Sequence, residues 1–126
     1  MSSSELKPYT LNITVPGLPK RINQMSGRTW YVRSAESKKW LSSISAYATI
    51  PPNPIRRAKL TLVRFSSRCP DYDGLVSSFK HVIDALVTLR ILEDDSMIHI
   101  GMPDFMWVIT DRGKGKIQII VEELFI

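Results

Sequence analysis

The chain has 126 residues, 44% of them apolar and 23% charged, which suits one globular domain with a single hydrophobic core. No apolar run approaches the roughly 20 residues that a membrane-spanning helix requires, and the polar N-terminus predicts no secretory signal, so we expect no membrane-spanning segment. The formal net charge of +5 is unevenly divided: residues 1–70 hold twelve Lys and Arg against two acids, whereas residues 71–126 hold five against ten.

This charge division indicates a polyanionic partner, with nucleic acid first and an anionic membrane surface second. Solvated surface charges on an ordinary protein would give the same totals, so composition leaves both interpretations open. The lone cysteine, Cys69, cannot form an internal disulfide. We therefore expect a reducing, cytoplasmic compartment, with Cys69 as a small core residue.

The first half of the chain predicts a strand, a loop and a helix. Residues 1–8 are polar and expected to be disordered, and residues 9–15 alternate apolar with polar side chains as a half-buried strand does. Residues 20–33 predict a long loop with a short strand at 30–32, in which Trp30 and Tyr31 either anchor the loop or stack on bases; anchoring is favoured. Ser34 is expected to cap a helix that runs to Ala48 and ends before the prolines at 51, 52 and 54.

The second half predicts four more strands and a second helix. The strands are expected at residues 58–65, 97–100, 105–110 and 116–124, and the last two should form a hairpin around two glycines. The helix follows from apolar side chains at one face of a helical wheel, namely Leu75, Phe79, Val82, Leu86 and Leu89. We expect one α+β domain over residues 1–126, a mixed sheet with two helices packed on one face.

Residues 69–95 hold six of the twelve acids of this basic chain: Asp71, Asp73, Asp84, Glu93, Asp94 and Asp95. In an extended segment, Asp71 and Asp73 project to the same side, and a reversal after the helix could return Asp94 or Asp95 to them. Lys80 lies on the same helix flank as Asp73 and Asp84. Clustered oxygen ligands suit Mg²⁺ or Mn²⁺, which bind phosphates through one or two carboxylates.

Simpler interpretations of the same residues remain open. Asp73 could be a helix cap, Lys80 and Asp84 a surface ion pair worth a few tenths of a kcal/mol, and the acids at 93–95 a solvated turn. The sequence lacks the residue spacings of several other functional motifs. These are the calcium-binding loop, zinc motifs with paired Cys or His, the phosphate-binding P-loop and the GxSxG elbow.

The motifs PDYDGL, FKHVIDAL and LEDDSMI follow one another in this order, beginning at Pro70, Phe79 and Leu92. Together they resemble the signature of the RusA family of Holliday junction resolvases from bacteria and their phages. The segment VPGLPKRIN, ending at Asn23, is similar to that family's proline-rich turn. Two differences are Gly74, where the family commonly has Asn, and an interval before Lys80 that is three residues longer.

The resemblance implies a Mg²⁺-dependent endodeoxyribonuclease, with Mn²⁺ as substitute, that resolves four-way DNA junctions by paired symmetric nicks. By position, Asp71, Asp73 and Asp95 would be catalytic and bind metal, with Asp94 beside them; Lys80 would be catalytic and Asp84 would orient it. The family acts as a homodimer on branched DNA, so a cytoplasmic protein associated with the nucleoid or phage DNA is implied. The expected DNA-binding residues are Lys20, Arg21, Asn23, Arg28, Arg33, Arg64, Arg68, Arg112, Lys114 and Lys116.

Two functions of other classes compete with this one. A DNA-binding protein without catalysis would use the same carboxylates to cap a helix and to repel misplaced phosphates. A metal-dependent phosphoesterase without junction selectivity would act on smaller phosphates.

Overall fold

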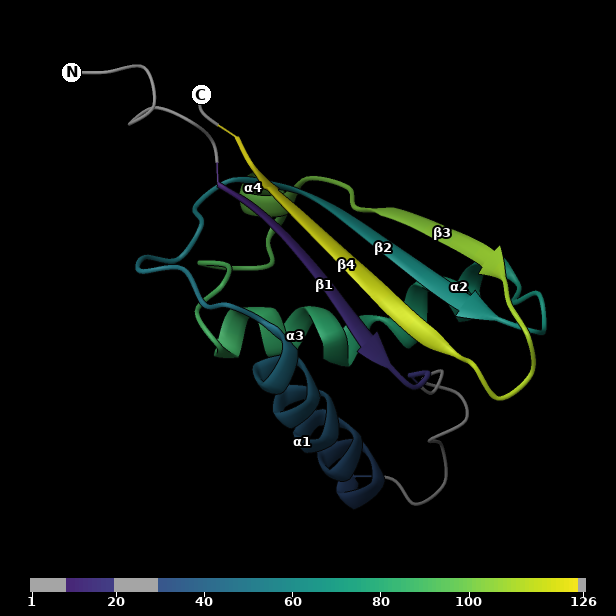
Figure 1. The fold of residues 1–126 in the computed structure, drawn as a ribbon. Coiled ribbons are helices and arrows are strands. Elements are labelled where there is room, and N and C mark those ends of the chain that lie inside the picture. Colours follow the sequence, from purple (N-terminus) through teal and green to yellow (C-terminus); the bar gives the residue numbers. More distant parts are fainter. Residues whose placement is uncertain (1–8, 20–29, 125–126) are drawn as a thin grey trace.

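Four strands form one mixed sheet in the computed structural model, which describes residues 9–19 and 30–124 (Figure 1). The strands are β1 (Thr10–Pro16), β2 (Ala58–Ser66), β3 (Asp104–Ile109) and β4 (Lys116–Glu123). Their spatial order is β1-β4-β2-β3, with β4 antiparallel to both of its neighbours and β3 parallel to β2. The mixed sheet confirms the expected α+β class.

The helices of the described residues are α1 (Trp30–Tyr47), α2 (Tyr72–Ser78), α3 (Lys80–Thr88) and the single turn α4 (Met97–Ile100). Figure 1 shows α1, α2 and α3 on one side of the sheet, with α4 near the beginning of β2. The two expected helices therefore correspond to α1 and to the α2–α3 pair. Across residues 9–19 and 30–124, no helix has the length and apolar character needed to cross a membrane.

Two short strand predictions are wrong. Residues 30–32 begin α1, so this helix starts before Ser34 rather than at it. Residues 97–100 form α4, in which the amides of His99 and Ile100 both donate to the Ser96 carbonyl, at 2.9 and 3.0 Å. Short apolar runs have no period that separates a strand from a helical turn, which explains both errors.

The predicted hairpin of the last two strands is also wrong. β4 lies between β1 and β2, and β3 pairs with β2 at the edge. The turn itself forms, since the Lys114 amide donates to the Asp111 carbonyl at 3.1 Å and Gly113 has a φ of 85°. A turn fixes the reversal of the chain but not the neighbour of the following strand. Ile117, Ile119 and Val121 are all buried, as a central strand requires.

The core lies between the sheet and the helices. Ile119 of β4 is paired with Ile13 on one side and Leu62 on the other, and all three are at most 1% exposed. From α1, Trp40 and Ile44 are fully buried, and the Trp40 indole donates to the buried Glu36 carboxylate at 2.9 Å. The predicted stripe on the second helix is confirmed: Leu75, Phe79, Val82 and Leu86 are buried, with Leu89 packed against them.

Candidate functional site

The first two aspartates lie at the beginning of α2, and they differ in role. Asp71 is the N-cap, with extended backbone, and its Oδ1 accepts a hydrogen bond from the Gly74 amide at 2.8 Å. Asp73 lies in the first turn, where the helix dipole favours a negative charge. The capping role considered for Asp73 therefore belongs to Asp71. Both side chains are exposed to solvent.

The expected helix is interrupted at Phe79, between α2 and α3. The hydroxyls of Ser77 and Ser78 donate back to the carbonyls of Gly74 and Leu75, at 3.4 and 2.8 Å. Such back-bonding competes with the regular helix and often bends it. The Phe79 amide then donates to the carbonyl three residues earlier, and α3 begins at the next residue. The break leaves the aspartates and Lys80 on separate short helices.

Lys80 and Asp84 form an ion pair on α3. Lys80 Nζ lies 3.6 Å from Asp84 Oδ2, and the side chains are 61% and 39% exposed. At this exposure the pair contributes at most a few tenths of a kcal/mol to stability. A ligand that binds Lys80 or Asp84 could therefore break this ion pair with little loss of folding stability.

A cavity of about 480 Å³ lies beside this pair, between α2, α3, α4 and β3. Its charged lining residues are Lys80, Asp84 and Asp95. The remaining wall is mainly apolar, made by Tyr72, Val76, Ser77, Ile83, Met97, Ile100, Gly101, Met102, Pro103 and Phe105. The structure thus brings Asp95 to the cavity of Lys80 and Asp84, whereas Asp71 and Asp73 do not line it.

The other two acids of the 93–95 run lie differently. Glu93 pairs with Arg56 at 3.3 Å, and its amide donates to the Ile55 carbonyl at 3.0 Å, which holds this segment beside residue 55. Asp94 is exposed and does not line the cavity. Of the three neighbouring acids, only Asp95 therefore lies at the cavity.

No three His, Cys, Asp or Glu side chains of the described ranges are grouped closely enough to hold one metal ion. The expected set of Asp71, Asp73 and Asp95 is therefore not brought together within a single chain. The candidate metal ligands lie instead in two places: Asp71 and Asp73 at the start of α2, and Asp95 at the cavity.

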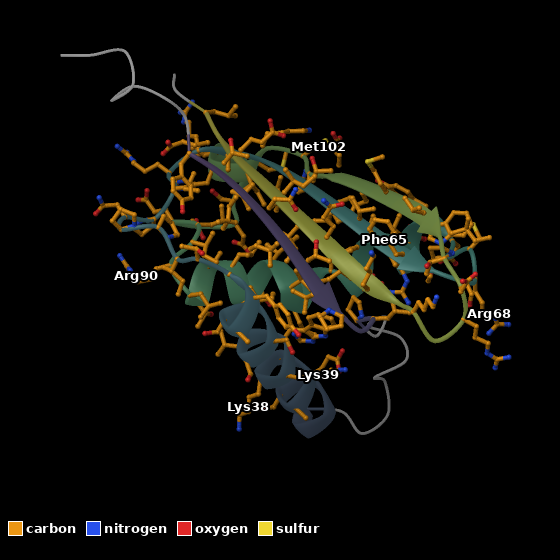
Figure 2. The ribbon with its side chains drawn as sticks, in the orientation of Figure 1. Lys38, Lys39, Phe65, Arg68, Arg90 and Met102 are labelled. Carbon is orange, nitrogen blue, oxygen red and sulfur yellow. The ribbon has the colours of Figure 1, made fainter. Side chains whose placement is uncertain are left out.

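Exposed basic side chains gather at the end of the sheet from which the chain enters α2. The Ser66 carbonyl at the end of β2 accepts from the Thr110 amide at 3.1 Å, and the Gly115 carbonyl accepts from the Gly17 amide at 2.9 Å. These bonds fix the 111–115 turn beside the ends of β1 and β2. The exposed cations of this end are Arg68, Arg112, Lys114 and Lys116. Figure 2 shows the Arg68 side chain projecting away from the ribbon.

The other residues expected to contact DNA are either half-buried or outside the described residues. Arg64 is half-buried and donates to the Pro19 carbonyl at 3.0 Å, so it supports the fold. Lys20, Arg21, Asn23 and Arg28 lie outside the described residues, as do the side chains of Trp30, Tyr31 and Arg33 and the whole of residues 1–8. Cys69 is exposed, so the expectation of a core cysteine is wrong.

Sequence reasoning missed the contribution of Tyr72 to the cavity wall. Tyr72 is 69% exposed and lines the cavity together with Val76 and Lys80. The spacing of these residues, four apart, places them along one side of a helical segment and could have revealed the wall.

No family model matches the chain, and no curated protein matches its sequence. The function must therefore be inferred from the site. The site has two exposed carboxylates at the start of α2 and a cavity that Lys80 of α3 lines. A basic surface lies at the same end of the sheet as the carboxylates.

Proposed function

We propose that the protein is a metal-dependent endodeoxyribonuclease that resolves four-way DNA junctions in the cytoplasm. The observation that carries the proposal is the position of Asp71 and Asp73, exposed at the start of α2 and only a few residues after Arg68. A basic surface at the same end of the sheet as paired carboxylates suits a phosphodiester held next to a divalent cation. The resemblance of the motifs within residues 70–98 to the RusA family suggests the junction as substrate.

The donor set is consistent with Mg²⁺, or Mn²⁺ as a substitute. Both are hard cations that prefer oxygen, and Mg²⁺ commonly takes only one or two carboxylates and completes its shell with water and substrate phosphate. Asp71 and Asp73 would provide these carboxylates, with Asp71 Oδ1 already accepting from the Gly74 amide. When bound, the metal would supply an activated water and would stabilise the leaving 3′-oxygen.

The cavity residues have complementary roles in this proposal. Lys80 is the cation of the cavity, and it would neutralise charge that develops on the scissile phosphate. Asp84, 3.6 Å from Lys80 Nζ, orients the ammonium group. Asp95 would add a carboxylate at the cavity, with the exposed Asp94 beside it.

The basic end of the sheet would bind the DNA backbone. Arg68, Arg112, Lys114 and Lys116 are exposed there, and phosphate contacts of this kind make binding weaken as salt rises. Two such surfaces in a homodimer would match the two-fold symmetry of a four-way junction.

A DNA-binding protein without catalysis is the second candidate. Two observations favour it: Asp71 already caps α2, and Lys80 already pairs with Asp84. Both groups then have structural roles that require no substrate.

Cleavage of a synthetic four-way junction by the wild-type chain tests the proposal. We expect paired, symmetric nicks in Mg²⁺ or Mn²⁺, none in EDTA, and no cleavage of a duplex with the same arm sequence, because the carboxylates need a cation to hold a phosphate. Denaturing gels of end-labelled strands measure the nicks. Junction binding without cleavage in either metal would favour the non-catalytic protein, and equal cleavage of duplex would remove the junction selectivity.

A second prediction separates Lys80 from its partner Asp84. Lys80→Gln is expected to slow cleavage of bound junction roughly 100-fold, because a positioned charge is lost from the transition state. Asp84→Asn should cost less, since the ammonium remains. Single-turnover rates at saturating protein measure both, and Lys38→Gln on α1 is the control, an exposed lysine outside the cavity. Equal rates for Lys80→Gln and Lys38→Gln would contradict the assigned role.

A further inference from the structure

The cavity between α2, α3, α4 and β3 has the size and the lining of a binding site for a planar ring. Its volume of about 480 Å³ falls within the range of roughly 300–1,000 Å³ that ligand sites occupy. Two aromatic side chains line it: Phe105, whose ring packs against the buried Phe79, and Tyr72, which is 69% exposed and accessible to an incoming group. The exposed thioethers of Met97 and Met102 add a flexible apolar surface that adapts to a flat ligand.

The charged groups of the cavity disfavour a phosphate inside it. Among the described residues that line it, Lys80 is the only cation, and its Nζ already lies 3.6 Å from Asp84 Oδ2. Asp95 adds a second carboxylate, which has no hydrogen-bond or ion-pair partner in the described part of the chain. An ionised carboxylate accepts hydrogen bonds and donates none. The cavity therefore selects an uncharged ring that carries N–H donors.

Tyr72 connects this cavity to the proposed metal site, because it lies between Asp71 and Asp73 in the sequence. A DNA strand with a phosphate at these aspartates would have a neighbouring base beside the cavity. Proteins that act on nucleic acids stack unpaired bases on exposed aromatic side chains and place them in pockets of this kind. Such unstacking costs least where the regular duplex is already interrupted, as it is at a branch point.

We propose that the cavity receives one base of the bound DNA, unstacked at the branch point, and that it prefers guanine. This inference rests on the proposed function, which supplies DNA as the ligand. Guanine presents two adjacent donors, N1–H and the N2 amino group, and these match the two oxygens of the Asp95 carboxylate. Adenine and cytosine present one amino donor beside an acceptor nitrogen, and thymine presents one N–H between two carbonyls. In each of these three bases, an acceptor would face a carboxylate oxygen.

Methionine methyl signals in nuclear magnetic resonance spectra measure the entry of a base without any measurement of cleavage. The chain has five methionines, of which Met97 and Met102 line the cavity and Met106 on β3 does not. In a titration with the DNA trinucleotide TGT in EDTA, ring currents of the bound guanine should shift the methyl signals of Met97 and Met102 and leave that of Met106 unchanged. We expect a millimolar dissociation constant, and binding of TTT should be at least about fivefold weaker.

Two variants test the wall and the acceptor separately. Val76→Trp is expected to fill the cavity and abolish the shifts, whereas Val108→Trp on β3, outside the cavity, is the matched control and should keep them. Inosine in place of guanine lacks the N2 amino group and should weaken binding to the wild type roughly fivefold. Asp95→Asn should remove this difference between guanine and inosine, because an amide offers only one acceptor oxygen. Circular dichroism spectra show whether each variant keeps the wild-type fold.

Several outcomes would overturn the proposal. They are equal shifts at all three methionines, equal affinity for TGT and TTT, persistent shifts in a folded Val76→Trp protein, and a preference for guanine over inosine that survives Asp95→Asn. Free dGMP that binds as tightly as TGT would overturn a DNA strand as the source of the base. Failure of the proposed function is distinguishable: a junction that is bound but not cleaved contradicts the nuclease, whereas cleavage without methionine shifts contradicts the base site alone.

Discussion

Asp73→Asn is expected to slow cleavage of a four-way junction by roughly 100-fold or more, because a metal ligand contributes several kcal/mol of charge stabilisation and about 1.4 kcal/mol corresponds to tenfold in rate. Junction binding in Ca²⁺ or EDTA should persist or become tighter, since one negative charge is removed next to the phosphates. The side chain is exposed and Asp71 provides the helix cap, so the fold should be little affected. Single-turnover cleavage and gel-shift titrations measure the two effects separately.

Glu122→Gln is the matched control for this variant. Glu122 is an exposed carboxylate near the end of β4 that lies far from the 111–115 turn, and the substitution removes the same charge. It should cleave at the wild-type rate. Wild-type cleavage by Asp73→Asn would remove Asp73 from the site, and loss of binding together with cleavage would indicate a role in DNA affinity instead.

Phe79→Ala is expected to lower the free energy of unfolding by about 3–5 kcal/mol, a large part of the roughly 5–15 kcal/mol that holds a domain of this kind together. Phe79 is fully buried, its ring centroid lies 6.1 Å from that of Phe105, and its carbonyl accepts from the Ile83 amide at 2.9 Å. The side chain therefore links the α2–α3 junction to β3. Urea unfolding followed by circular dichroism measures the loss.

Tyr47→Ala provides the comparison on α1, because Tyr47 is an aromatic residue that is 56% exposed. We expect it to lower stability by less than about 1 kcal/mol. Phe79→Leu should lie between the two, since it keeps most of the buried apolar volume. If Phe79→Ala and Tyr47→Ala unfold at the same urea concentration, the α2–α3 junction does not contribute to the core as described.

The parts of the fold that the sequence predicts are those with a repeating apolar period. The alternation in β1, β2 and β4 and the stripe from Leu75 to Leu86 locate these elements closely. The errors fall where the chain has no such period, at residues 30–32 and 97–100. The neighbour of β4 was also missed, because strand order depends on contacts between distant residues and a turn gives no information about them. His81, which is not part of the predicted apolar stripe, is also buried, and both ring nitrogens are enclosed without a hydrogen-bond partner in the described residues.

For the candidate site, helical spacing placed Lys80 beside Asp84 correctly, since four residues make about one turn. Spacing could not show the break at Phe79, which depends on two serine hydroxyls bonding back to the helix. Nor could it show whether Asp95 reaches the pair at residues 71 and 73, because that distance is set by the path of residues 89–96. The exposed position of Cys69 likewise depends on the path of the chain between Ser66 and Asp71.

The strand order has a consequence for how the protein is made. β1 and β2 do not pair with each other, because β4 lies between them and pairs with both. During synthesis, residues 116–123 emerge after the other three strands, and until then β1 has no strand to pair with among the described residues. Until Ile119 is available to pack against them, Ile13 and Leu62 remain exposed in the nascent chain and can promote aggregation. We expect a slow folding reaction that is completed only once β4 has left the ribosome, as is usual for sheets built from distant segments.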